Sequence, residues 1–148
     1  MKKIGRVIQT FSAPKGFKAK VRPIVAKLDM LEGHGIKNDK FAGKNEDRAV
    51  MIIGQKAYDI ANNNGMDVSF GSLGENILLD FDPHTLAIGT ILEVNGAELE
   101  VTQSCTICKS LCKFGDTLPE LLANDRGIYC KVIKSGMIVQ GDEITLKG

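Results

Sequence analysis

The sequence predicts a mostly β (α+β) fold, a closed or nearly closed mixed β-barrel of short strands with two or so short helices. Three observations support this prediction. The apolar runs are short and rich in β-branched residues, most of them end at a Gly-containing turn, and only two stretches have a helical pattern. The chain has 148 residues, 43% of them hydrophobic, with no linker and no repeat. We therefore expect a single domain over residues 1–148.

The strands are predicted where apolar residues alternate or run together. The clearest turn is Asn95-Gly96, because Asn-Gly between two apolar runs is typical of a two-residue hairpin. Ser135-Gly136 predicts another tight turn. The predicted strands are Ile4–Thr10, Ile24–Leu28, Ala49–Ile53, Asn76–Leu79, Ile91–Val94, Glu98–Thr102, Ile128–Ile133, Met137–Val139 and Glu143–Leu146.

Two helices are predicted between the strands. Gln55–Asn63 is the first, ended by the Asn-rich cluster before Gly65, and Asp116–Ala123 is the second, with Pro119 in its first turn. The stretch Met30–Arg48 has no periodicity. A loop of that length in a compact domain is more often functional than idle, so we expect it to contribute to a site.

Charge is distributed unevenly along the chain. The first 28 residues contain eight basic residues and no acidic one, whereas the remainder has 11 basic and 18 acidic residues. This asymmetry predicts a local site for an anion rather than a nucleic-acid coat, and the absence of Trp argues against a stacking platform for single strands. No apolar run is long enough for a membrane helix or an export signal, so we expect a cytoplasmic protein with reduced cysteines and no membrane partner.

Three of the four cysteines lie within eight residues, at Cys105, Cys108 and Cys112. Lys109 and Lys113 stand beside them, and nearby ammonium groups lower the pKa of a thiol. Three chemistries remain open on this pattern. They are a zinc or iron–sulfur site that also uses Cys130, a redox dithiol at Cys105 and Cys108, and a single nucleophilic or ligating thiolate.

Five motifs together resemble a known family. Val101-Thr102-Gln103 followed by Cys108 is similar to the V-T-Q-x-x-x-x-C signature of MOSC domains, the C-terminal domains of molybdenum cofactor sulfurases. Four further motifs match in the family's order. Residues 35–43 resemble a G-I-E-G-D-x-H-A-G loop, and Arg48 and Ile52 resemble an R-x-V-x-L-I strand. Residues 74–77 resemble F-G-E-N-I, and residues 126–129 with 141–143 resemble R-G-I-Y … G-D-E-V. Cys112 and the short length resemble the small stand-alone bacterial members.

The resemblance implies a MOSC-like barrel with a cleft and one key cysteine, Cys108, with Cys112 as a second catalytic candidate. Cys108 would carry sulfur or ligate the molybdenum of a pterin cofactor, which implies a sulfurtransferase or a molybdenum-dependent reductase of N-hydroxylated compounds. Thiolate is a soft ligand suited to such metals. The chain departs from the family at Phe41, where a loop His is usual, and at Lys109. The family is also associated with pyridoxal phosphate, but we expect no pyridoxal phosphate domain in these 148 residues.

An anionic cofactor or substrate needs cationic partners, and Arg suits bidentate capture of phosphate. The expected partners also include a sulfur donor or an electron-transfer protein. The predicted cofactor-binding residues are Lys20, Arg22, Asp39, Arg48, Glu75, Asn76 and Arg126, with Asp39, Glu75 and Asn76 ordering the cleft.

Two other functions remain open. The small size is consistent with a non-catalytic module that delivers a pterin or a sulfur group to a partner enzyme. The four cysteines are consistent with a structural zinc site.

Overall fold

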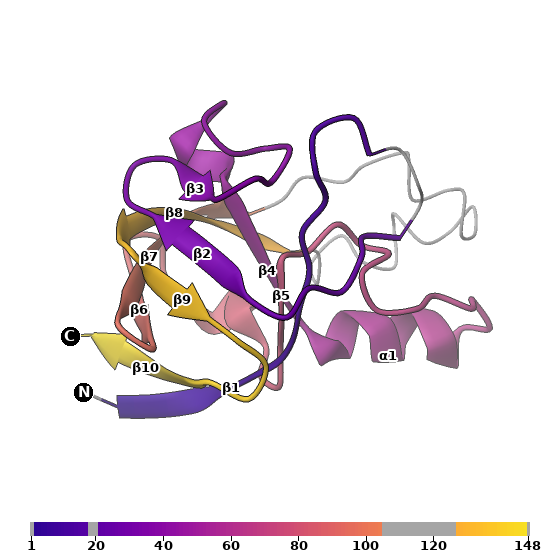
Figure 1. Cartoon of the computed structure of the whole chain (residues 1–148). Helices are drawn as coiled ribbons and strands as arrows, with labels where there is room; N and C mark the ends of the chain where they lie inside the picture. Colours follow the sequence, from indigo (N-terminus) through magenta and orange to yellow (C-terminus); the bar gives the residue numbers. More distant parts are fainter. Residues whose placement is uncertain (1, 18–20, 105–126, 148) are drawn as a thin grey trace.

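The computed structural model describes residues 2–17, 21–104 and 127–147, which form a closed seven-stranded barrel, a separate three-stranded sheet and one α-helix (Figure 1). The barrel order is β1-β10-β6-β7-β8-β4-β5, and the small sheet has the order β3-β2-β9. None of the described helices is long and apolar enough to cross a membrane. The elements are β1 (Lys2–Thr10), β2 (Leu28–Leu31), β3 (Gly35–Ile36), the 3-10 turn η1 (Glu46–Arg48), β4 (Val50–Gly54), α1 (Gln55–Asn63), β5 (Ile77–Leu79), the 3-10 turn η2 (Pro83–Thr85), β6 (Ile91–Val94), β7 (Ala97–Ser104), β8 (Ile128–Lys134), β9 (Gly136–Ile138) and β10 (Glu143–Lys147).

One strand pair in the barrel is parallel, and it explains the all-apolar runs of β4 and β5. Ile52 pairs with Ile77 in this parallel ladder, and α1 makes the crossover between the two strands. Ile52 packs in the barrel interior, whereas Ile53 packs with Leu78 in a second cluster that includes the buried face of α1. Both faces of these strands are therefore buried, as is usual for parallel strands.

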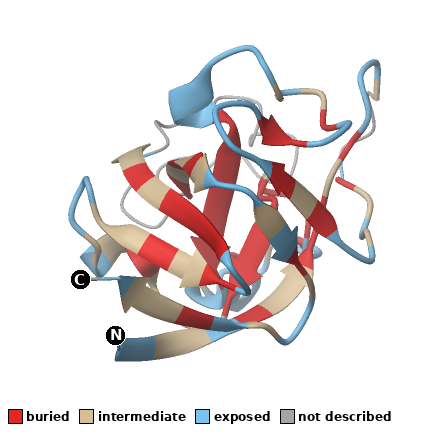
Figure 2. Cartoon of the chain, turned by 60° about the vertical axis from the view of Figure 1, so that its left-hand side comes forward, coloured by how far each residue is buried: buried red, intermediate tan, exposed pale blue. Residues whose placement is uncertain are grey.

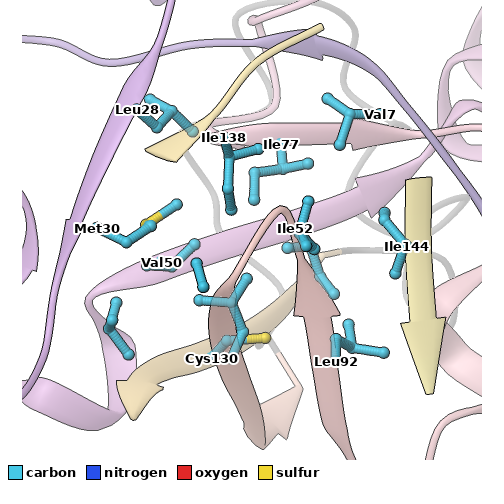
Figure 3. Close-up of a cluster of buried hydrophobic side chains, with 14 of the residues drawn as sticks. Val7, Leu28, Met30, Val50, Ile52, Ile77, Leu92, Cys130, Ile138 and Ile144 are labelled. Carbon is cyan, nitrogen blue, oxygen red and sulfur yellow. The ribbon is translucent and has the colours of Figure 1, made fainter. Parts of the chain in front are cut away.

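The barrel interior is filled by branched aliphatic side chains from all around the wall. Figure 2 shows the buried residues along the strands, and Figure 3 shows how labelled side chains such as Val7, Ile52 and Ile144 converge. Cys130 on β8 is among them and is fully buried, as expected for a cysteine on a predicted strand. A closed wall leaves no free strand edge in the barrel.

Most of the predicted elements are confirmed. The helix Gln55–Asn63 has the predicted bounds, and Asn95-Gly96 forms the predicted hairpin, with φ values of 48° and 86° and with Val94 paired to Ala97. Two positive φ angles are what a type I′ turn requires. The predicted helix Asp116–Ala123 lies outside the described residues.

Two predictions about strands and turns are wrong. Only Leu28 of the predicted strand Ile24–Leu28 is in a strand, because the Thr10 hydroxyl and carbonyl bind the backbone of Val25 and tie this segment to the end of β1. Ser135-Gly136 does not close a hairpin. Gly136 belongs to β9, which pairs with β2 rather than β8, and it lies so close to β7 that an added Cβ would be 2.6 Å from the Ala97 nitrogen.

The aperiodic stretch Met30–Arg48 is largely turns, as its lack of periodicity indicates. It contains the end of β2, the two-residue strand β3 and η1. Asn38 adopts φ 68°, a left-handed conformation that Asn tolerates better than most residues.

Candidate functional site

Several segments with predicted site residues join the barrel near one row of residues, which crosses β7, β8 and β4 and continues to the start of β5 and the end of β1. The row consists of Gln103, Tyr129, Met51, Asn76 and Phe11, linked by strand pairing from β7 to β4 and by backbone hydrogen bonds from β4 to the end of β1. The segments that carry the cysteines, the 12–22 loop, the 69–75 loop and η1 all begin or end within three residues of this row. We refer to it below as the strand-crossing row.

The two ends of the cysteine-bearing stretch are held together at the row. Ser104, the last residue of β7, pairs with Ile128, the first residue of β8. Next to Ile128, Gly127 packs so closely on the Met51 side chain that an added Cβ would be 2.7 Å from its terminal methyl carbon. The same methyl group is 3.9 Å from the Cβ position of Gly74, so this end of the stretch lies close to the 69–75 loop.

Asn76 connects the strands within the row. Its Oδ1 accepts a hydrogen bond from the Met51 amide at 3.0 Å, and its Nδ2 donates to the Phe11 carbonyl at 3.1 Å. Asn76 is buried, so its side chain replaces ladder hydrogen bonds at the point where β5 begins. The side-chain amide is thereby used inside the protein, and contact between Asn76 and a cofactor stays a prediction.

Asp39 holds Arg22 in place. Its Oδ1 accepts from the Ser12 hydroxyl at 2.7 Å, the Ala13 amide at 3.2 Å and Arg22 Nη1 at 3.2 Å, and its Oδ2 accepts from the Phe41 amide at 3.1 Å. Asp39 and Arg22 are both buried. With its carboxylate oxygens occupied by four donors, Asp39 acts by orienting Arg22 and the surrounding loops.

Arg22 has one side-chain hydrogen bond within the described part of the chain. Asp39 is its acceptor there, and a guanidinium has five N–H groups in all. The guanidinium carbon lies 5.0 Å from the ring centroid of Phe41, the residue that stands where a loop His is usual. An exposed aromatic ring therefore lies beside the one strongly buried cation of the described residues.

Arg48 lies at the other end of the row, against β8. Its guanidinium carbon is 5.9 Å from the Tyr129 ring centroid. The Thr102 hydroxyl lies between the carbonyls of Asp47 and Tyr129, and it ties η1 to β7 and β8. Asn45 caps η1 through a 3.0 Å bond to the Asp47 amide. The exposed guanidinium of Arg48 is thus held beside β8, the strand that follows the cysteine-bearing stretch in the sequence.

Glu75 is fully buried and pairs with Tyr58 of α1. The Tyr58 hydroxyl donates to Glu75 Oε2 at 2.5 Å and accepts from the amides of Gly71 and Leu73. Burial is the main cause that raises the pKa of Glu75 above its usual value, and burial, followed by the neighbouring Glu75 carboxyl, raises the pKa of Tyr58. Tyr58 and Thr102 were not predicted as site residues. Nothing in the local spacing distinguishes Tyr58 from an ordinary helix residue, and Thr102 was noted only as part of the V-T-Q motif.

Four of the predicted site residues fall in stretches that the structure does not describe. Cys108, Cys112, Lys20 and Arg126 lie outside the described residues, as do Cys105 and Lys18. Within the described ranges, no three His, Cys, Asp or Glu side chains are grouped closely enough to hold a metal ion. Burial raises the pKa of the Cys130 thiol to about 12, which opposes its use as a thiolate ligand.

Solved structures with the same fold support this description of the barrel. The chain is similar to the YuaD protein from Bacillus subtilis, with 22% identity, a TM-score of 0.72, and coverage of 97% of this chain and 96% of that one. It is also similar to YiiM from Geobacillus stearothermophilus, with 19% identity, a TM-score of 0.71, and coverage of 99% and 75%. YiiM from Escherichia coli gives 18% identity, a TM-score of 0.71, and coverage of 97% and 70%.

No curated protein matches the sequence. The family model described as MOSC domain, in contrast, matches residues 38–145, a range that includes η1, the paired strands β4 and β5, and β6 to β8. This range also contains all five residues Asp39, Arg48, Glu75, Asn76 and Cys108. On this match, and on the barrel that accompanies it, the chain belongs to the MOSC domain family.

Proposed function

We propose that this MOSC domain binds the molybdenum cofactor, or carries sulfur destined for it, at the strand-crossing row, with Cys108 as the ligating or sulfur-carrying thiolate. The single observation that carries the proposal is the pairing of Ser104 with Ile128 at this row. Cys108 follows Ser104 by four residues, and four residues span at most about 14 Å. This length of chain is enough for the Cys108 thiol to reach the row, which supports the proposal.

The described residues suit the anionic part of such a cofactor. Arg22 is buried and oriented by Asp39, its one side-chain acceptor among the described residues, and Arg48 presents an exposed guanidinium against Tyr129. Guanidinium groups bind phosphate through two parallel hydrogen bonds. These residues would hold a phosphate, and the bound cofactor would supply a metal centre that accepts a soft thiolate ligand.

The sulfur-carrying form of the proposal depends on thiol chemistry alone. A persulfide forms when the Cys108 thiolate attacks the outer sulfur of a donor persulfide, whose own thiolate leaves, so the reaction needs no external oxidant. A low pKa and solvent access favour this step. Cys130 lacks both features, because it is buried and its pKa is raised.

The test is to purify the protein from cells that make the cofactor and to measure molybdenum and sulfane sulfur per chain. We expect wild-type protein to carry one or the other and Cys108→Ala to lose at least tenfold of it. Cys130→Ala is the matched control and should keep the wild-type content once its stability has been checked. If Cys108→Ala retains both species at wild-type levels, the proposal is wrong.

Two further measurements separate the alternatives. Reduction of an N-hydroxylated base with an electron donor present would show catalysis and exclude a pure carrier module. Zinc that is bound one to one, survives dialysis and vanishes in Cys105→Ser would instead support a structural zinc site. The burial of Cys130 already argues against a site that uses all four cysteines.

A further inference from the structure

Two buried glutamates in this protein have opposite surroundings. Both carboxylate oxygens of Glu98 accept hydrogen bonds from Lys147 Nζ, at 3.0 and 2.9 Å. Glu75, in contrast, has an Oε1 atom with no hydrogen-bond partner among the described residues, and its Oε2 accepts from the Tyr58 hydroxyl and from the Gly71 amide at 3.2 Å. An ionised carboxylate needs a counter-charge or several donors when it is buried, and within the described ranges Glu98 has a cation at bonding distance whereas Glu75 has none.

The Glu75–Tyr58 pair is connected to Arg22 through one residue. The Gly71 amide donates to both members of the pair, and the Gly71 carbonyl accepts from the Arg22 amide at 3.0 Å. Gly71 has φ 92°, and a Cβ at this position would lie 2.8 Å from the Arg22 carbonyl oxygen. The backbone of Arg22 therefore rests directly on the loop that Glu75 and Tyr58 hold.

We propose that Glu75 and Tyr58 are positioning residues for Arg22, acting through Gly71, and that Glu75 performs this role as a neutral carboxylic acid. A neutral acid leaves one weak polar atom unpaired at Oε1, whereas an ionised carboxylate would leave a buried charge without a bonded cation. The importance of Arg22 to the ligand rests on the proposed function, but the link from Glu75 to Arg22 does not.

The direction of the pH dependence follows from the groups that face Glu75. Burial raises its pKa and is the largest cause, whereas the Tyr58 hydroxyl from α1 and the positive charge of Arg22 lower it. Glu75 is thus neutral below its folded pKa and ionises above it. Between the pKa of the unfolded chain and the folded pKa, the native state binds one more proton, so this group makes the folding constant fall by up to tenfold per pH unit as the pH rises.

Nuclear magnetic resonance tests this inference on the intact protein without any cofactor. The Glu75 carboxyl carbon should have the chemical shift of a protonated acid at neutral pH, while Glu98 in the same spectra has that of a carboxylate. As the pH is raised, the amide signals of Gly71 and Arg22 should move with the same midpoint as Glu75. In Glu75→Gln, which keeps the size and the neutral charge, both amides should hold their positions through that range.

Tyr58→Phe distinguishes a positioning role from a merely structural one, because a structural role would leave the pH midpoint of Glu75, Gly71 and Arg22 unchanged. This variant removes a hydrogen bond that lowers the Glu75 pKa, so the common midpoint should shift to higher pH. A Glu75 carboxylate signal at neutral pH would overturn the proposal, and so would a Glu75 titration that leaves both amides unmoved. If the coupling is found but molybdenum and sulfur do not depend on Cys108, the proposed function alone is wrong.

Discussion

Replacing Asn76 by Ala should destabilise the barrel strongly. The substitution leaves the buried Met51 amide and Phe11 carbonyl without their side-chain partners, at 3.0 and 3.1 Å in the native structure. Each unsatisfied buried group costs about 1–3 kcal/mol, so the free energy of unfolding should fall by about 2–6 kcal/mol. For a chain of this length the melting temperature falls by about 2–4 °C for each kcal/mol.

Urea unfolding followed by circular dichroism measures the loss. Asn64→Ala is a matched control, because its exposed amide bonds only the Ile60 carbonyl within its own helix, and it should cost less than about 1 kcal/mol. Asn76→Asp retains the acceptor for Met51 but places an oxygen against the Phe11 carbonyl, so it should also destabilise. A loss below about 1 kcal/mol in Asn76→Ala would refute the idea that this side chain substitutes for ladder hydrogen bonds.

Three further substitutions or treatments have expected outcomes. Gly136→Ala should cost about 1–3 kcal/mol in urea unfolding, since its Cβ would lie 2.6 Å from the Ala97 nitrogen and force β9 away from β7; an unchanged midpoint would contradict this close packing. Asp39→Asn should cost about 3–5 kcal/mol, because it leaves the buried Arg22 charge without its carboxylate, and wild-type stability would show that the pair is not needed. In a variant where Cys130 is the sole cysteine, mass spectrometry should find almost no alkylation by iodoacetamide in the folded protein and full alkylation in urea, because only burial suppresses its thiolate.

Local signals in the sequence predicted the elements that depend on local chemistry. The Asn95-Gly96 hairpin and the helix Gln55–Asn63 are of this kind, since turn residues and apolar spacing determine them. The position of β2 could not be predicted in the same way, because β2 lies between β3 and β9 in its sheet and β9 is distant in the chain. Leu28 of β2 pairs with Ile138 of β9, a separation of 110 positions. The departure of β9 from β8 is set by the contact of Gly136 with β7, which is also nonlocal.

The candidate site shows the same division. The motifs predicted Asp39 and Glu75 as site residues, and the basic N-terminal segment predicted Arg22. Neither signal indicated that Arg22 and Asp39 pair or that Glu75 is fully buried. Pairing and burial depend on how the loops cross outside the barrel. Tyr58 shows this most clearly, because its hydroxyl acquires its role only when the 69–75 loop folds back over α1.

The pairing of Ser104 with Ile128 also has a consequence for how such a chain can evolve. Ser104 is the last residue of β7 and Ile128 is the first residue of the neighbouring antiparallel strand β8. The strands on either side of the intervening stretch are therefore already paired in the barrel wall. The entropy cost of closing a loop grows only slowly with its length. We therefore expect insertions, deletions or exchanges between positions 105 and 126, where three of the cysteines stand in the sequence, to leave the register of the seven strands unchanged, so the residues of this stretch and the stability of the barrel can be selected separately.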